Sequence, residues 1–204
     1  MTLKALMADV DGVIVRPLHP WGWAATLEAD LGLSSAQLDN AFFTPNWDDI
    51  IHGRAGLHER LAPVLAEIAS HLTSQALADY WFARDSDLDT NLLEQIAALR
   101  ARGVKAHLAT VQEHQRARHL WEDLALRDHF DAMHYSAELG AAKPDAAFFE
   151  AIERRNGLAP EQMFFIDDKP ANVEAAKARG WPAAVWTGEL RLADLLSEAG
   201  IAVP

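Results

Sequence analysis

A small set of polar residues lies where apolar runs of the sequence end, or in the loops that follow them. The set comprises Asp9, Asp11, Thr110, Lys143, Asp167 and Asp168. In an open α/β sheet, ligands bind at the carboxyl ends of the strands, where loops from neighbouring strands converge. We therefore expect four carboxylates, one hydroxyl and one ammonium group to share a single site.

Four carboxylates gathered without a counter-ion would repel one another and raise one another's pKa values. A hard divalent cation relieves this repulsion. An all-oxygen ligand set without Cys or His at the strand ends favours Mg²⁺, which typically combines one or two carboxylates with water and substrate phosphate oxygens. The same cation would let a phosphate dianion approach an acidic pocket, and Lys143 would add positive charge. The residues thus predict metal-assisted phosphoryl chemistry with Mg²⁺ as the cofactor.

The segments that must position these residues alternate between strand and helix patterns. The expected strands span 3–8, 104–109, 132–135, 163–166 and 183–186, and the expected helices span 91–102, 113–126, 146–155 and 171–179. Glycine follows three of these helices, at Gly103, Gly157 and Gly180, and provides the left-handed stop that often ends a helix. Such alternation implies right-handed crossovers and predicts a doubly wound parallel α/β sheet covered by helices on both faces.

The segment between the first strand and the next strand-helix unit has a different texture. Helical patterns dominate it, over 21–31, 35–43, 57–69 and 74–84. Because this stretch is too long for one crossover helix, we expect a helical cap domain inserted into the core. The expected domains are a core of residues 1–15 and 90–204 and a cap of residues 16–89.

Composition narrows the classes of partner and compartment. The 204 residues, 50% of them hydrophobic and 24% charged, suit a globular core with one modest insertion. A net charge of −12 disfavours nucleic acid as a partner, since nucleic-acid binding needs a basic surface. The absence of cysteine excludes disulfides, thiolate zinc sites and a cysteine nucleophile. Without a signal-peptide pattern or an apolar run of bilayer length, we expect a cytoplasmic protein with no membrane partner.

Four short motifs resemble, in the same order, those of the haloacid dehalogenase (HAD) superfamily, in its phosphatase-like branch with a helical cap after the first motif. They are DVDGV at 9–13, AT at 109–110, KPD at 143–145 and FFIDDKPANV at 164–173. The resemblance covers nearly all of the core. The cap matches only in position, length and helical character.

The resemblance implies a role for each residue of the set. Asp9 would attack phosphorus and become an aspartyl-phosphate, a known use of a carboxylate nucleophile. Asp11 would protonate the leaving alkoxide and then deprotonate the hydrolytic water, with its backbone carbonyl on Mg²⁺. Thr110 and Lys143 would hold the transferring phosphoryl oxygens. The metal ligands would be Asp9, Asp11 and Asp168, together with Asp167 directly or through water.

These roles predict a Mg²⁺-dependent phosphatase that hydrolyses a small phosphorylated metabolite, such as a sugar phosphate, with the cap closing over the leaving group. Asp11 favours phosphate esters over halides, because a halide leaves without a proton. Two alternatives stay open: a phosphomutase of the same fold, and a non-catalytic binding protein that keeps the scaffold. The sequence indicates neither the natural substrate nor the oligomeric state.

A few residues depart from the family pattern or lie outside the motifs. Val111 stands where many relatives have Asn, which removes one substrate-side hydrogen bond. His107, within an expected strand, is interpreted as a buried structural histidine. The segment 85–89 begins like a calcium loop but lacks the required Gly and closing Glu, so we expect a hinge in which Asp89 or Thr90 caps the next helix.

Tryptophan is concentrated in the expected cap. Trp21, Trp23, Trp47 and Trp81 all fall there. We interpret most of them as part of the cap core or its contact with the main domain. One or two, together with Arg54, are also candidates for lining the substrate pocket.

Overall fold

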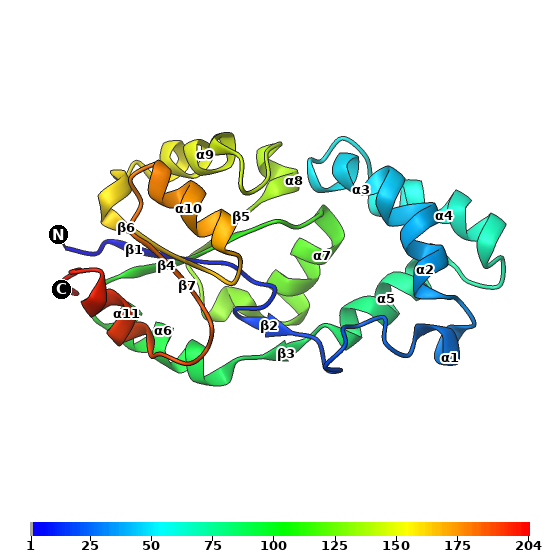
Figure 1. Cartoon of the computed structure of the whole chain (residues 1–204), viewed down its shortest axis with the longest axis horizontal. Helices are drawn as coiled ribbons and strands as arrows, with labels where there is room; N and C mark the ends of the chain where they lie inside the picture. The colour runs from blue at the N-terminus through cyan, green and yellow to red at the C-terminus, as the bar shows by residue number, and fades with distance from the viewer. Residues whose placement is uncertain (1) are drawn as a thin grey trace.

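A five-stranded parallel sheet forms the centre of the computed structural model, which describes residues 2–204 (Figure 1). Met1, assigned above to the core domain, lies outside the described residues. The strands are β1 (Ala5–Ala8), β4 (Lys105–Thr110), β5 (Ala132–Tyr135), β6 (Met163–Asp167) and β7 (Ala183–Val185). Their order is β5-β4-β1-β6-β7, so the chain winds outward from β1 in both directions. This confirms the predicted doubly wound α/β fold.

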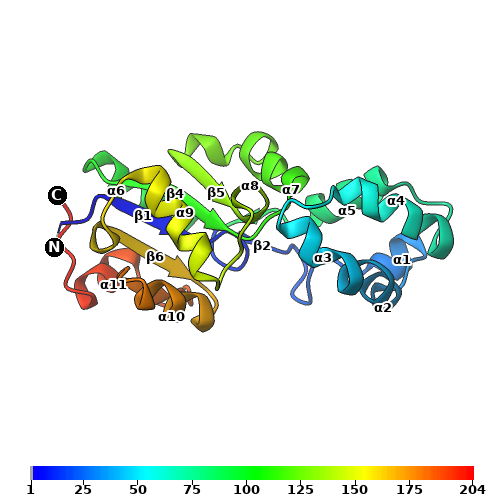
Figure 2. The same ribbon diagram turned by 90° about the horizontal axis from the view of Figure 1, so that it is seen from above.

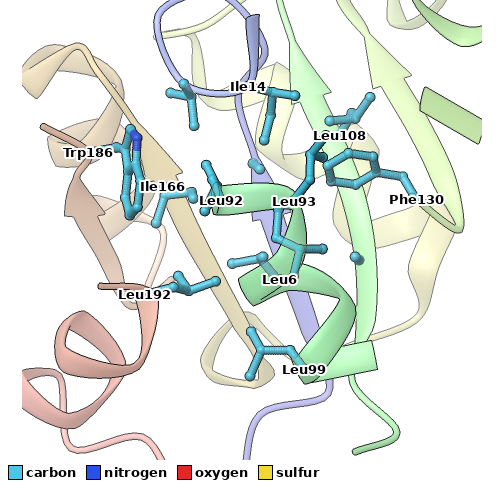
Figure 3. Close-up of a cluster of buried hydrophobic side chains, with 14 of the residues drawn as sticks. Leu6, Ile14, Leu92, Leu93, Leu99, Leu108, Phe130, Ile166, Trp186 and Leu192 are labelled. Carbon is cyan, nitrogen blue, oxygen red and sulfur yellow. The ribbon is translucent and has the colours of Figure 1, made fainter. Parts of the chain in front are cut away.

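Helices cover both faces of the sheet, so the strand residues that point to either face are apolar. Leu6, Leu108 and Ile166 face α6 (Thr90–Ala101) and α11 (Leu192–Glu198), as Figure 3 shows. The intervening strand residues, such as Met7 and Phe165, belong to a second cluster. That cluster includes residues of α9 (Ala146–Asn156) and α10 (Pro170–Ala178). Two packed faces hold the strand ends in fixed register.

Two short elements complete the core beside β4 and β5. The predicted helix at 113–126 is α7 (His114–Arg118), which continues through the π-helical turn His119–Asp123 and ends before Ala125, a residue with a positive φ of 54°. The short helix α8 (Ser136–Leu139) follows β5 directly. Both lie at the carboxyl ends of their strands, next to the position of the expected site.

The cap is helical and projects from the carboxyl-end edge of the sheet (Figures 1 and 2). Its elements are α1 (Leu27–Leu31), α2 (Ser35–Leu38), a π-helical turn (Asp39–Phe43), α3 (Thr44–Ile51), α4 (Leu57–Ile68) and α5 (Ser74–Arg84). They enclose a hydrophobic cluster of their own. We propose on this basis that residues 16–89 form a domain distinct from 1–15 and 90–204.

One helix predicted for the cap needs correction, and one helix of the cap was not predicted. The segment predicted as a helix at 21–31 becomes helical only at Leu27. Within it, Gly22 adopts a φ of 96°, which excludes this residue from a right-handed helix. The helix α3 was not predicted. It continues from the π-helical turn without a break, since Phe43 and Thr44 keep right-handed helical dihedral angles, and Pro45 lies just after this turn.

The two chain crossings between core and cap are joined to each other. The short strand β2 (Val15–Arg16) pairs with β3 (Asp87–Leu88) in antiparallel fashion, and the Arg16 guanidinium lies 3.0 Å from Asp89. The other carboxylate oxygen of Asp89 accepts a hydrogen bond from the Leu92 amide at 2.9 Å. The expectation that Asp89 caps the helix after the hinge is therefore confirmed.

A buried arginine ties the core to the end of the cap helix α5. Arg116 on α7 is 1% exposed and donates hydrogen bonds to the carbonyl oxygens of Phe82 and Asp85. Its guanidinium also lies 3.4 Å from the Asp85 carboxylate. The burial of Arg116 was not predicted from the sequence, because an arginine on an amphipathic helix usually faces solvent.

A second contact between cap and core is a close approach of backbone at Gly53. Gly53, in the loop after α3, has a φ of 70°, and a Cβ atom at this position would clash with the carbonyl oxygen of Ala137 in α8. Glycine is thus required both by the backbone conformation and by the close approach of the two chains.

His107 is buried in the sheet, as expected, and is paired with a second histidine. Its Nδ1 lies 3.1 Å from Nε2 of His134 on β5. Burial lowers the pKa of both imidazoles, and that of His134 falls to about 4, with the charge of His107 adding to the effect. The pair is therefore neutral at physiological pH and has a structural role.

This pair predicts a specific pH dependence of stability. The unfolded chain, with a histidine pKa near 6.5, binds more protons than the folded chain below that pH. The wild type should lose about 3 kcal/mol of unfolding free energy through His134 as the pH falls from about 7 to 4, and His134→Gln should not. Urea unfolding at several pH values measures the difference. His71→Gln, at an exposed histidine of the cap, serves as the control, and a constant difference between wild type and His134→Gln would contradict this account.

Candidate active site

Three carboxylates meet where β1 and β6 end. One oxygen each of Asp9, Asp167 and Asp168 lie within 4.8 Å of one another. Asp9 is 5% exposed and Asp167 is fully buried. The parallel register of β1 and β6, which aligns Ala8 with Ile166, brings the residues that follow side by side. This part of the predicted site is therefore assembled by the sheet itself.

The ammonium group of Lys143 lies between two of these carboxylates. Its Nζ is 2.9 Å from Asp9 Oδ1 and 2.6 Å from Asp167 Oδ2, and it also donates to the carbonyl oxygen of Ala109 at 2.9 Å. The Lys143 side chain is only 1% exposed. A buried ammonium is stable only when paired in this way, so Lys143 and the carboxylates require one another.

Asp167 is surrounded by donors on both of its oxygens. Oδ1 accepts from the Lys169 amide at 2.8 Å, and Asn172 Nδ2 lies 3.0 Å from each oxygen. Together with Lys143, these donors occupy most of the lone pairs of the carboxylate. Asp167 therefore holds Lys143 and the start of α10 in place. Asn172 belongs to the fourth motif, but the sequence did not indicate a role for it.

Asp168 is the carboxylate that lacks partners. Its Oδ1 is buried and accepts no hydrogen bond from any residue between 2 and 204. Its Oδ2 is approached by the backbone of Gly12, where an added Cβ would lie 2.6 Å away. A buried, unpaired carboxylate oxygen next to two further carboxylates is the donor set that Mg²⁺ prefers. The residues present therefore fit the predicted cation.

Burial also raises the pKa values of two carboxyl groups in the cluster. It raises the pKa of Asp9 to about 6, and Asp167 and Asp11 add to the rise while Lys143 opposes it. Burial likewise raises the pKa of Asp168. A divalent cation would favour the ionised forms of both groups, in line with the charge argument made from the sequence.

The remaining two predicted residues lie beside this cluster. Thr110, at the end of β4, is fully buried. Asp11 is exposed, and its carboxylate is not among the three that share the possible cation site. Its Oδ2 accepts a hydrogen bond of 2.7 Å from Gln112, whose Nε2 lies 3.4 Å from Thr110 Oγ1. Gln112 was not predicted.

The cap tryptophans divide into two groups. Trp21 is 87% exposed. Trp23, Trp47 and Trp81 pack with Phe43 at ring separations of 5.2 to 6.4 Å and line a cavity of about 320 Å³ within the cap. Arg54 is exposed and paired with Asp48 and Asp49, outside the lining of that cavity. Their suggested contact with substrate stays a prediction.

Comparison with protein families gives a match that covers the four motifs. A family model described as haloacid dehalogenase-like hydrolase matches residues 3–180, which include all six predicted site residues. The chain is a haloacid dehalogenase-like hydrolase. The resemblance seen in the sequence is thereby confirmed for the family.

Curated relatives of this hydrolase match over part of their length. Phosphoglycolate phosphatase of Rhodospirillum rubrum is 33% identical over 93 residues, which cover 46% of this chain and 39% of the relative. Phosphorylated carbohydrates phosphatase of Thermotoga maritima is 28% identical over 87 residues, which cover 43% and 40%. The chain thus matches about two fifths of the length of each relative.

Solved structures match the whole fold of the hydrolase. A HAD family enzyme from Bacteroides thetaiotaomicron, in a magnesium complex, superposes with a TM-score of 0.81 at 18% identity, covering 96% of this chain and 99% of the other. A HAD-like family hydrolase from Porphyromonas gingivalis superposes with a TM-score of 0.78 at 20% identity, covering 97% and 98%. Within residues 2–204, no helix has the length and apolar character needed to cross a membrane.

The approach of Gly12 to Asp168 yields a prediction for cation binding. Gly12→Ala should push the Asp168 carboxylate away from Asp9 and weaken Mg²⁺ binding by about 10- to 100-fold, the range seen when support around a ligand is lost. Titration calorimetry with Mg²⁺ measures the affinity. Gly140→Ala is the matched control, because Gly140 also has a positive φ but an added Cβ would meet nothing within 4 Å. Equal Mg²⁺ affinity in all three proteins would show that the contact is irrelevant.

Proposed function

We propose that this hydrolase is a Mg²⁺-dependent phosphatase that acts on a small phosphate monoester through an aspartyl-phosphate. The observation that carries the proposal is the cluster in which Asp9, held by Lys143, lies beside Asp168 with its unpaired buried oxygen. The names of the curated relatives, which are phosphatases of phosphoglycolate and of phosphorylated carbohydrates, support the same class of substrate.

The geometry of Asp9 suits in-line attack on phosphorus. Its Oδ1 accepts from the Val10 amide at 2.7 Å and is paired with Lys143, which fixes the plane of the carboxylate. Asp9 attacks phosphorus through one of its carboxylate oxygens. As its bond to phosphorus forms, the bond from phosphorus to the ester oxygen breaks, and Asp11 gives a proton to the departing alkoxide.

The second half of the reaction reuses the same groups. Asp11, now ionised, takes a proton from a water molecule that attacks the aspartyl-phosphate, and phosphate leaves with regeneration of Asp9. Thr110 and Lys143 hold phosphoryl oxygens during both transfers. Pre-positioned donors of this kind stabilise the charge that develops in the transition state.

The expected Mg²⁺ would be held by Asp9 and Asp168, with Asp167 beside them and the backbone carbonyl of Asp11 as a further ligand. When bound, it would supply positive charge that offsets the repulsion between the acidic cluster and a phosphate dianion. Asp167, whose lone pairs are mostly occupied by protein donors, would contribute through water.

The cap limits the size of the substrate. It stands at the same edge of the sheet as the cluster and contacts the core at Gly53 and Arg116. A small metabolite fits beneath such a cover better than a macromolecule, and closure would exclude bulk water. A cytoplasmic location and the absence of nucleic-acid partners remain predictions from composition.

Removing the nucleophile tests the covalent step. Asp9→Asn should lower kcat by at least about 1,000-fold, since an amide oxygen is a far weaker nucleophile, while the protein stays folded. Phosphate release from a panel of sugar phosphates and other small esters, with Mg²⁺, measures the change. Asp145→Asn, an exposed residue of the third motif, is the control. Substantial turnover by Asp9→Asn would exclude the aspartyl-phosphate, and isomer formation in place of phosphate release would indicate a mutase.

Metal exchange tests the coordination. Ca²⁺ prefers six to eight oxygen ligands at longer distances than the octahedral shell of Mg²⁺, so replacing Mg²⁺ with Ca²⁺ should lower kcat by about tenfold or more. The assay is steady-state phosphate release after chelation and addition of either ion, with recovery on return of Mg²⁺ as the control. Equal rates with the two ions would contradict the proposed geometry.

A further inference from the structure

The side chain of Gln112 connects the two predicted site residues that lie outside the carboxylate cluster. Its Nε2 donates to Asp11 Oδ2 at 2.7 Å and lies 3.4 Å from Thr110 Oγ1. An amide nitrogen carries two hydrogens at a fixed angle, so both contacts are made by one planar group. Gln112 is 4% exposed, which restricts its side chain to this arrangement.

The backbone of Gln112 is held just as firmly. Its amide donates to Ser136 Oγ at 3.1 Å, and Ser136 Oγ donates back to the Gln112 carbonyl oxygen at 3.1 Å. The Ala137 amide donates to the same carbonyl oxygen at 3.2 Å. Ser136 is fully buried at the start of α8. The backbone of the residue whose side chain contacts Asp11 is therefore anchored to the neighbouring junction between β5 and α8, and not only to its own loop.

This arrangement determines which atoms of Asp11 and Thr110 face the substrate. With Oδ2 of Asp11 accepting from Gln112, Oδ1 is the oxygen on which a proton can be carried to a leaving group. With Oγ1 of Thr110 accepting from the same amide, the hydroxyl hydrogen is free to be donated to a phosphoryl oxygen. The side chain of the neighbouring residue, Val111, has no polar group that could perform either task.

We propose that Gln112 is a positioning residue that orients Asp11 for proton transfer to the leaving group. The proposal rests on the proposed function, because it assigns Gln112 an effect on a phosphate ester reaction. Gln112 itself exchanges no proton and touches no reacting atom.

The leaving group distinguishes positioning from mere structural support. A 4-nitrophenolate ion departs from phosphorus without needing a proton, whereas an alkoxide from a sugar phosphate needs one. Misplacement of Asp11 should therefore slow the alkyl ester far more than the aryl ester. A general loss of folding or of phosphate contact would slow both esters equally.

The experiment compares Gln112→Leu with the wild type on 4-nitrophenyl phosphate and on the best sugar phosphate of the panel. Leucine has a similar volume but no donor. We expect kcat/KM to fall by about 10- to 100-fold for the sugar phosphate, part of the effect attributed to general acid catalysis, and by less than about threefold for the aryl ester. Gln115→Leu, on the same segment but without contact to Asp11, should change neither value by more than about twofold.

Crystal structures of the wild type and Gln112→Leu provide a measurement that does not depend on turnover. We expect the Asp11 side chain to lose its single orientation in the variant, while Asp9 and Asp168 keep theirs. An unchanged Asp11 orientation, or equal loss of kcat/KM with both esters, would overturn the positioning role. A wild type that hydrolyses no ester would overturn the proposed function, and the crystallographic comparison would still decide the orientation of Asp11.

Discussion

A buried ammonium group balanced between two carboxylates is the interaction on which the site depends. Lys143 Nζ lies within 2.9 Å of both Asp9 and Asp167, and none of the three side chains is more than 7% exposed. Neither the cation nor the anions could be buried there alone without a large desolvation penalty. The loop that carries Lys143 is therefore fixed to the ends of β1 and β6 by charge, and the remaining groups of the site are arranged around this contact.

The division of labour between Asp167 and Asp168 follows from this balance. The acceptor positions of Asp167 are occupied by Lys143, Asn172 and a backbone amide, so its role is to hold the surrounding structure in place. Asp168 keeps a buried oxygen without a partner among residues 2–204 and so remains available to a cation. Two adjacent residues of the same type thus differ in function because Asp167 ends strand β6 and Asp168 begins the loop that follows, which gives them different neighbours.

The sequence was sufficient for the parts of the structure that depend on local pattern. Apolar runs ending in polar residues located all five core strands, and the ordered motifs placed Asp9, Asp167, Asp168 and Lys143 in one site. Helix α3 was missed because it continues the helical turns beyond the end of the helix predicted at 35–43, and helix α1 was predicted to begin too early, in a segment that contains Gly22 with its positive φ. Hydrophobic periodicity alone does not locate these helix boundaries.

The contacts of Gln112 and Arg116 could not be predicted for a different reason. Each joins segments that are distant in the chain: Gln112 to Asp11 and Ser136, and Arg116 to the end of α5. Nothing in the local sequence distinguishes a glutamine or arginine that will be buried from one that faces solvent. A departure from the family pattern, Val111, lies next to Gln112 and was the only local sign that the loop after β4 is unusual.

The seam between cap and core at Gly53 has a consequence for the placement of the cap. Gly53 lies against the carbonyl oxygen of Ala137, and His114 Nε2 would be 3.4 Å from a Cβ atom added at this position. Any other residue here would have to displace the backbone of α8. This point of the seam therefore sets how near the two bodies can come.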